Sequence, residues 1–310
     1  MNRSGLSRRQ WIAGAFSILP AWGASRPQGL LIDTHIHLFS EDQKRFAYHP
    51  EAPYKPPAQP LEAYAEFIRQ SKIDHVIIVH PEPYQDDHRY LEYCFAKEPS
   101  PGFFKGTCLF DPIAPETPSR MEALVRRNAG RIVALRVHQM RKPGSPPATG
   151  GAIKDRDMAH PAMKTTWRKA ADLGLAIQMH FLPYYATQIA PLASEFSGMP
   201  VILDHLGRAG QGRPEHFAEV LKLARNPRVY MKYSAVRYSS KEKSPFRDAK
   251  PLVRRAFDAF GPDRMIWGGL GHNMDQFGEA VEVFNVMFDF ASETDRAKIR
   301  GLNAKKLYKF

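Results

Sequence analysis

The sequence is poor in cysteine, since only Cys94 and Cys108 among its 310 residues carry a thiol. The two stand alone rather than in a Cys-x-x-Cys spacing, which excludes a disulfide-rich scaffold and argues against a zinc ribbon or a dithiol redox motif. We expect two buried thiols rather than a bridge. The sequence also lacks a long run of Lys and Arg, although its formal net charge is +12. Scattered basic residues are typical of a solvated surface, so no nucleic-acid partner is expected, whereas a homo-oligomer is compatible with the sequence.

Beyond its first residues, the chain has no apolar run of the roughly 20 residues that a membrane-spanning helix needs. At the amino terminus, Arg8 and Arg9 directly precede the uncharged stretch 10–25, which ends in small residues. This pattern is typical of a twin-arginine export signal, in which the charges stay on the cytoplasmic side and signal peptidase cuts beside small side chains. We expect residues 1–25 to be this signal and residues 26–310 to form one mature domain in the periplasm, with no stable membrane span.

No Gly-x-Gly-x-x-Gly loop follows the first apolar run and no Gly-x-Ser-x-Gly elbow occurs, so a dinucleotide fold and a serine nucleophile are both disfavoured. From Leu30 onward, short apolar runs alternate instead with amphipathic stretches. We expect eight strands, centred on 31–36, 75–80, 104–110, 132–138, 175–181, 201–204, 229–234 and 265–268. Helices are expected over 61–70, 89–96, 120–128, 162–173, 185–196, 215–224, 252–260 and 277–290. Eight such units predict an α/β fold, a (β/α)8 TIM barrel, rather than an open doubly wound sheet.

Two irregular stretches follow strand ends, the proline-containing segment Phe46–Pro60 and the Pro- and Gly-rich segment Arg141–Asp157. In a barrel, the loops after the strands stand over the active face. Both segments are therefore candidate lids or substrate walls.

Histidines lie at the ends of four predicted strands. They are His35 and His37 on the first, His138 on the fourth together with Arg136, His180 on the fifth and His205 on the sixth. Residues i and i+2 of a strand share a side, and the carboxyl ends of barrel strands meet at one face. The imidazoles are therefore expected to surround a common point, where a Zn²⁺ or related ion with an open coordination position would polarise a carbonyl or acidify water.

Four motifs carry a resemblance to a known family. They are His35-Ile36-His37, Asp204-His205-Leu206-Gly207, the run Tyr230–Ser234 and Asp263-Arg264-Met265-Ile266-Trp267-Gly268. Together with His180 they resemble the amidohydrolase superfamily, in its amidohydrolase-related branch, which includes sugar-lactone and pyrone lactonases and metal-dependent nonoxidative decarboxylases. The resemblance implies one divalent metal ion, zinc by preference, held by His35, His37 and His180. It also implies that His205 contacts the metal or the substrate and the developing oxyanion.

The sequence departs from the family pattern in two places. The fourth strand bears Arg136 and no lysine at its end, so a two-metal site bridged by a carbamylated lysine is disfavoured. Family members usually read Trp-Gly-Ser-Asp after the eighth strand, and the Asp serves as metal ligand and base, but Leu270 stands in its place here. Leu270 can neither coordinate nor accept a proton, so His272 or Asp275 is the candidate replacement base.

Substrate-binding residues are predicted on the same face. Arg136 would clamp a substrate carboxylate through its planar donor fork or, equally, form a salt bridge inside the barrel. His138 and Glu82 would line the pocket. Lys232 and Tyr233 alternate on the seventh strand, so only one of them can face the interior, and Lys232 would there favour an anionic substrate.

These features predict a metal-dependent hydrolase that opens a small lactone or amide, carboxylated or sugar-derived. A lactonase is preferred because the sixth- and seventh-strand motifs look closest to the sugar-lactonase group. Two alternatives stay open. One is a nonoxidative decarboxylase that uses the same site, and the other is a barrel that has lost catalysis and binds a small ligand, which Leu270 favours.

Overall fold

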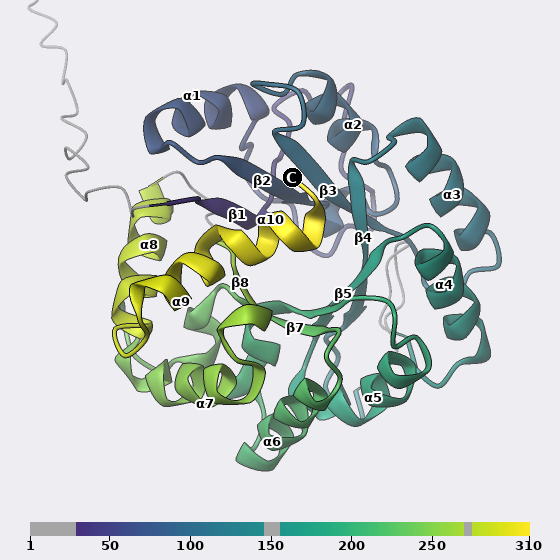
Figure 1. The fold of residues 1–310 in the computed structure, drawn as a ribbon. Coiled ribbons are helices and arrows are strands. Elements are labelled where there is room, and N and C mark those ends of the chain that lie inside the picture. Colours follow the sequence, from purple (N-terminus) through teal and green to yellow (C-terminus); the bar gives the residue numbers. More distant parts are fainter. Residues whose placement is uncertain (1–28, 146–155, 270–274) are drawn as a thin grey trace, which may run out of the picture.

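A computed structural model describes residues 29–145, 156–269 and 275–310. Eight parallel strands follow one another around a single sheet in the order β1 to β8, so the predicted (β/α)8 barrel is confirmed (Figure 1). The strands are β1 (Ile32–Ile36), β2 (His75–Val79), β3 (Phe104–Leu109), β4 (Ile132–Gln139), β5 (Ala176–Phe181), β6 (Val201–Leu203), β7 (Val229–Tyr233) and β8 (Met265–Trp267). The export signal predicted for residues 1–25 lies outside the described residues and stays a prediction. None of the helices described is both long and apolar enough to cross a membrane.

Helices surround the sheet and bury one apolar stripe each against its outer face (Figure 1). They are α1 (Leu61–Ser71), α2 (Arg89–Ala96), α3 (Thr117–Arg127), α4 (Pro161–Asp172), α5 (Ala186–Glu195), α6 (Pro214–Lys222), α7 (Lys250–Phe260) and α8 (Asp275–Met287). In α7, for example, Val253, Ala256 and Phe260 recur at helical spacing and are buried. Cys94 and Cys108 are free and buried in this same layer, as predicted.

The carboxyl-terminal segment forms two helices that the sequence analysis did not predict, α9 (Glu293–Ala297) and α10 (Asn303–Tyr308). Figure 1 shows α10 crossing the end of the barrel. Its Ala304 and Tyr308 pack with Ile32 and Ile77 inside the barrel, so this helix closes the floor. Charged residues dominate the segment and few apolar residues mark its buried side, which is why its sequence pattern was weak.

The barrel interior is layered because side chains alternate along the strands. On β4 the inward residues are Ala134, Arg136 and His138, and their register partners on β5 are Ala176, Gln178 and His180. The two alanines belong to the apolar floor cluster. From the floor upward, the interior thus changes from apolar to charged or amide and then to imidazole. The candidate site is the uppermost layer, at the carboxyl ends of the strands.

A bulge in β1 turns the two histidines of this strand inward. Ile32 packs in the interior cluster, whereas Ile36 packs in the outer layer, although strict alternation would put both on one side. The register confirms one extra residue in β1. Asp33 pairs with Val76 and Ile36 pairs with Ile78, so three residue steps on β1 lie opposite two on β2. Without the bulge, an interior Ile32 would leave the His-x-His pair facing the helices.

Side chains fasten β1 to β8. Within the described residues no backbone ladder joins these two strands. Instead, the Thr34 hydroxyl donates to the Trp267 carbonyl at 2.6 Å, and the Gly269 amide donates to the Asp33 carboxylate at 2.9 Å. A Cβ on Gly268 would lie 2.7 Å from the Cβ of His35, so a glycine is required for the two strands to approach. We call this contact the β1–β8 seam.

Outside the site, His80 and His88 form a buried imidazole pair with ring centroids 4.4 Å apart. His80 donates from Nε2 to the Gln85 carbonyl, and His88 accepts from the Leu109 amide. Burial lowers the pKa of His80 to about 4. Because the unfolded chain binds this proton near pH 6.5, acid favours unfolding, and the stability that the neutral ring provides is lost as the pH falls from 6.5 toward 4.

We expect His80→Gln to flatten the acid dependence of stability by up to about 1.4 kcal/mol per pH unit in this window, because the amide keeps a donor for Gln85 and does not titrate. Urea unfolding measured at several pH values provides the slope. His160→Asn, at an exposed cap, is the control and should leave it unchanged. An identical slope in His80→Gln and the wild type would contradict the prediction.

Candidate active site

The middle layer of the barrel is organised around the carboxylate of Asp204, which is fully buried. It accepts hydrogen bonds from Nε of Arg136 and from the amide of Gln178, each at 3.1 Å, and it lies 3.2 Å from Nζ of Lys232. Nζ of Lys232 also donates to the Thr34 carbonyl at 3.0 Å. One carboxylate therefore holds two buried cations in place.

The charges of this layer set its protonation states. Burial alone would raise the pKa of Asp204, but Lys232 and Arg136 hold that pKa well below its ordinary value. Burial lowers the pKa of Lys232, and Asp204 opposes this shift. In the layer above, burial holds the pKa values of His35, His180 and His205 well below normal, and the neighbouring cations add to the effect. Neutral imidazoles thus lie above a cationic layer.

Five imidazoles form a continuous chain around the top of the barrel, and they are the histidines of the predicted strand ends. Successive ring centroids are 5.0, 4.7, 5.3 and 4.9 Å apart along the order His37, His35, His205, His180 and His138. We call this set the imidazole chain. Imidazoles from β1, β4, β5 and the segment after β6 therefore lie next to one another at one end of the barrel.

A left-handed turn follows β6 and positions two members of the site. His205, Leu206, Gly207 and Arg208 all have φ between 53° and 58°. Such a conformation costs about 1–2 kcal/mol for each residue other than glycine. Gly207 is required here, because a Cβ would lie 2.7 Å from a methyl group of Val220. Backbone strain of this kind is common where function requires a particular side-chain direction.

The turn brings the His205 ring to the Ser234 hydroxyl at 2.8 Å and the Arg208 guanidinium to the His180 ring at 2.7 Å. Arg208 also lies over the Tyr238 ring, 3.8 Å from its centroid. Since a guanidinium only donates, Nε2 of His180 accepts and its Nδ1 carries the proton in the neutral ring. Arg208 and Ser234 were not predicted as site residues, although the Asp204-His205-Leu206-Gly207 motif directly precedes Arg208.

Lys232 is the interior member of its pair, as alternation required, and Tyr233 packs against Phe284 and Phe288 in the outer layer. Arg136 and Lys232 both form salt bridges with Asp204 inside the barrel. For Arg136, this is one of the two roles that the sequence predicted. The other two predicted pocket residues pair with each other, with Oε1 of Glu82 3.0 Å from Nδ1 of His138.

The two irregular segments that were predicted to be lids or substrate walls differ in how much of each the structure describes. In Phe46–Pro60, Gln59 forms an antiparallel bridge with Phe39, which ties the end of this segment to the residues after β1. Most of Arg141–Asp157 lies outside the described residues. So do His272 and Leu270, and Asp275 begins α8 without a described side chain, so the replacement base predicted there stays a prediction.

The β1 histidines fit a metal ion. Nδ1 of His37 donates to the Val79 carbonyl at 2.7 Å, which leaves a lone pair on Nε2 in the neutral ring. This nitrogen lies 3.4 Å from Nε2 of His35. Two ligands at Zn–N distances of about 2.0–2.1 Å on a tetrahedral ion lie about 3.3–3.4 Å apart. Among the described residues, His35, Asp204 and His205 also bring ligand atoms within 4.8 Å of one another. His180 would have to release Arg208 to bind through Nε2.

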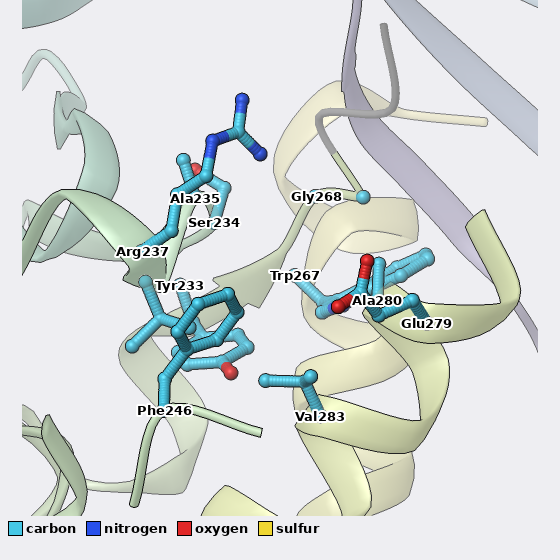
Figure 2. A pocket seen from close by; sticks show the side chains of 12 residues that line it. Tyr233, Ser234, Ala235, Arg237, Phe246, Trp267, Gly268, Glu279, Ala280 and Val283 are labelled. Atoms are coloured by element: carbon cyan, nitrogen blue, oxygen red, sulfur yellow. The ribbon is translucent and has the colours of Figure 1, made fainter. Parts of the chain in front are cut away.

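A separate cavity of about 90 Å³ lies between β7, β8 and α8 (Figure 2). Figure 2 shows Tyr233, Phe246 and Val283 gathered at one end and the Arg237 guanidinium at the other. Its lining includes Tyr233 of the outer layer and Ser234, whose hydroxyl contacts His205, but none of the five imidazoles. The imidazole chain is therefore the candidate active site.

Comparison with known proteins shows the family to which the chain belongs. A family model described as amidohydrolase matches residues 32–310, from β1 to the end of the chain. The chain belongs to the amidohydrolase family. This amidohydrolase is 26% identical over 293 residues to a 4-sulfomuconolactone hydrolase from Hydrogenophaga intermedia, covering 89% of this chain and 88% of that protein. The resemblance inferred from the motifs is confirmed, and with it the expectation of a hydrolytic enzyme.

Solved structures share the fold of this amidohydrolase. A putative 2-pyrone-4,6-dicarboxylic acid hydrolase from Pseudomonas putida has a TM-score of 0.72 at 21% identity, covering 90% of this chain and 97% of that one. A zinc-bound amidohydrolase from Burkholderia multivorans has a TM-score of 0.71 at 15% identity, with 91% and 100% covered. A 2,6-dihydroxybenzoate decarboxylase from Rhizobium has a TM-score of 0.61 at 14% identity, with 91% and 99% covered. These likenesses concern the barrel, which lactonases and decarboxylases both use.

We expect Asp204→Asn to lower the free energy of unfolding by about 3–5 kcal/mol, because Lys232 and Arg136 would keep buried charges without a counter-ion. Urea unfolding monitored by tryptophan fluorescence measures the change. The control is Asp258→Asn, which breaks an exposed ion pair with Arg254 and should cost only about 0.5 kcal/mol or less. Equal losses in the two variants would contradict the role of Asp204.

Proposed function

We propose that this amidohydrolase opens a small lactone that bears an acidic group, with water as the nucleophile. The observation that carries the proposal is the imidazole chain, in which five imidazole rings lie at the carboxyl ends of the strands above two fixed cations. Neutral imidazoles can accept and return protons near neutral pH. The relative that acts on 4-sulfomuconolactone and the structural neighbour named for a pyrone dicarboxylic acid support a lactone with an acidic substituent.

Charge at the site supports an anionic substrate. Arg208 is mostly buried at the level of the imidazole chain, and burial lowers its pKa only to about 10, so it stays charged at neutral pH. Arg136 and Lys232 lie below and are paired with Asp204. Arg208 is therefore the cation best placed to attract a carboxylate or sulfonate, while Lys232 and Arg136 contribute through the field of the layer beneath.

The proposed cofactor is one divalent ion, zinc by preference, held by His35 and His37 with His180 or His205 as the third donor. When bound, it would polarise the lactone carbonyl. The protein supplies the rest. Ser234 fixes the His205 ring beside the reacting carbonyl, and the low pKa of the buried rings keeps them neutral until a proton is delivered. The ring-opened product leaves as a carboxylate.

Lactone opening releases one proton at neutral pH, so a pH-indicator assay tests the function directly. We expect acid release from 4-sulfomuconolactone or 2-pyrone-4,6-dicarboxylate to exceed that from an uncharged lactone. The decarboxylase alternative predicts carbon dioxide from 2,6-dihydroxybenzoate instead, and the ligand-binding alternative predicts neither product. His205→Gln should abolish acid release, and His160→Asn should retain it. Acid release that is absent from every lactone in the wild type would contradict the proposal.

Metal removal tests the cofactor. Dialysis against a chelator should abolish lactone opening, and added Zn²⁺ should restore it. The double variant His35→Ala/His37→Ala should bind less metal than the wild type by elemental analysis, because it lacks both adjacent Nε2 donors. His75→Gln, at the opposite end of the barrel, should bind as much as the wild type. Undiminished turnover by metal-free protein would exclude the metal-dependent form of the proposal.

A further inference from the structure

Glu82 and His138 form a carboxylate–imidazole pair at the edge of the imidazole chain. Glu82 begins the short helical turn after β2, Glu82–Tyr84, and His138 lies near the end of β4. Oε1 of Glu82 is 3.0 Å from Nδ1 of His138. This distance is within the range of a hydrogen bond. The Asp204 carboxylate comes only to 3.8 Å from Nδ1 of His35.

This contact fixes which nitrogen of His138 carries the proton. A glutamate side chain is ordinarily a carboxylate at neutral pH, and a carboxylate can only accept, so Nδ1 of His138 donates to Oε1 of Glu82. The lone pair of the neutral ring is then on Nε2.

Nε2 of His138 is a buried acceptor with no partner in the described part of the chain. The side chain is 3% exposed, and its ring lies edge-on to that of His180, with centroids 4.9 Å apart. Most buried polar atoms are satisfied, so an unpartnered one beside a reactive site calls for a donor such as a water or a substrate hydroxyl. Elsewhere in the chain, Nε2 of His180 accepts from Arg208, and Nδ1 of His205 lies 2.8 Å from Ser234. Nδ1 of His180 and Nδ1 of His35 are also without a hydrogen bond among the described residues, but the first carries the proton of the neutral ring and the second faces the Asp204 carboxylate at 3.8 Å.

We propose that His138, oriented by Glu82, is the general base that activates the attacking water. This inference rests on the proposed lactone hydrolysis and supplies the proton acceptor that Leu270 cannot be. Nε2 takes one proton from water as the new carbon–oxygen bond forms at the carbonyl carbon. Collapse of the adduct breaks the bond between the acyl carbon and the ring oxygen, and the leaving oxygen takes the proton from His138. Glu82 is a positioning residue, because it holds the ring and stabilises its transient positive charge.

The test uses full-length protein and the lactone that the wild type opens fastest. His138→Gln should lower kcat by about 10²- to 10⁴-fold with little change in KM, as expected for loss of a general base rather than of a binding contact. Glu82→Gln should lower kcat by about 10- to 100-fold, the effect of losing one hydrogen bond to a charged group. His75→Gln, a partly buried histidine at the barrel floor, is the matched control and should keep wild-type kcat.

Two further measurements separate a base from a structural residue. His138→Ala should regain turnover with added imidazole, whereas Glu82→Gln should not. Hydroxylamine attacks a lactone without prior loss of a proton, so the His138 variants should form hydroxamate at close to the wild-type rate while hydrolysis stays slow. An equal loss of both reactions would show that His138 binds substrate or maintains the fold, and would overturn the proposal.

The pair can also be tested without turnover. Proton NMR of the wild type should show a low-field imidazole N–H resonance that disappears in both Glu82→Gln and His138→Gln and persists in His75→Gln. If the wild type opens lactones but His138→Gln keeps full kcat, the base assignment fails while the proposed function stands. If the wild type opens no lactone, both fail, and the resonance then reports only whether the pair exists. Absence of the resonance contradicts the geometry itself.

Discussion

The site depends on one buried carboxylate. Asp204 holds Arg136, Gln178 and Lys232 in the middle of the barrel, where these side chains are at most 3% exposed. Two unpaired cations at this depth would cost several kcal/mol each. With the carboxylate present, the layer retains an excess of positive charge, and this charge lies directly below the imidazoles. The residues that pair within the barrel therefore also set the charge beneath the imidazoles.

This arrangement explains why the rings above it are neutral. Each is buried, and the nearest charged groups below include cations, so protonation is opposed by both desolvation and repulsion. Glu82 is the exception at the rim, where a carboxylate faces an imidazole from another strand. The site thus contains two kinds of histidine, those above a positive layer and one beside a negative group. Such a difference in surroundings is what allows chemically identical side chains to take different roles.

The alternating pattern of the sequence was sufficient to predict eight strands, the helices around them and the histidine-rich face, because periodicity reports which side of an element is buried. It could not reveal the bulge in β1. Asp33, Thr34 and His35 are all polar, so the inserted residue does not visibly interrupt the alternation of apolar and polar residues. Arg208 was missed because its position depends on four consecutive left-handed residues, a conformation that only Gly207 suggests. The floor helix α10 was missed because its buried residues are few.

The β1–β8 seam also links ligand binding to the stability of the barrel. Seven strand pairs are joined by backbone ladders, but this one is held in the described residues by the side chains of Asp33 and Thr34 and by Lys232 reaching the Thr34 carbonyl. These residues adjoin His35. A molecule bound by the histidines of β1 would therefore also stabilise the β1–β8 seam, the one strand contact without a described backbone ladder. A ligand bound at the carboxyl ends of the strands would then slow local unfolding at the β1–β8 seam. The enzyme would therefore resist opening most when its substrate is bound.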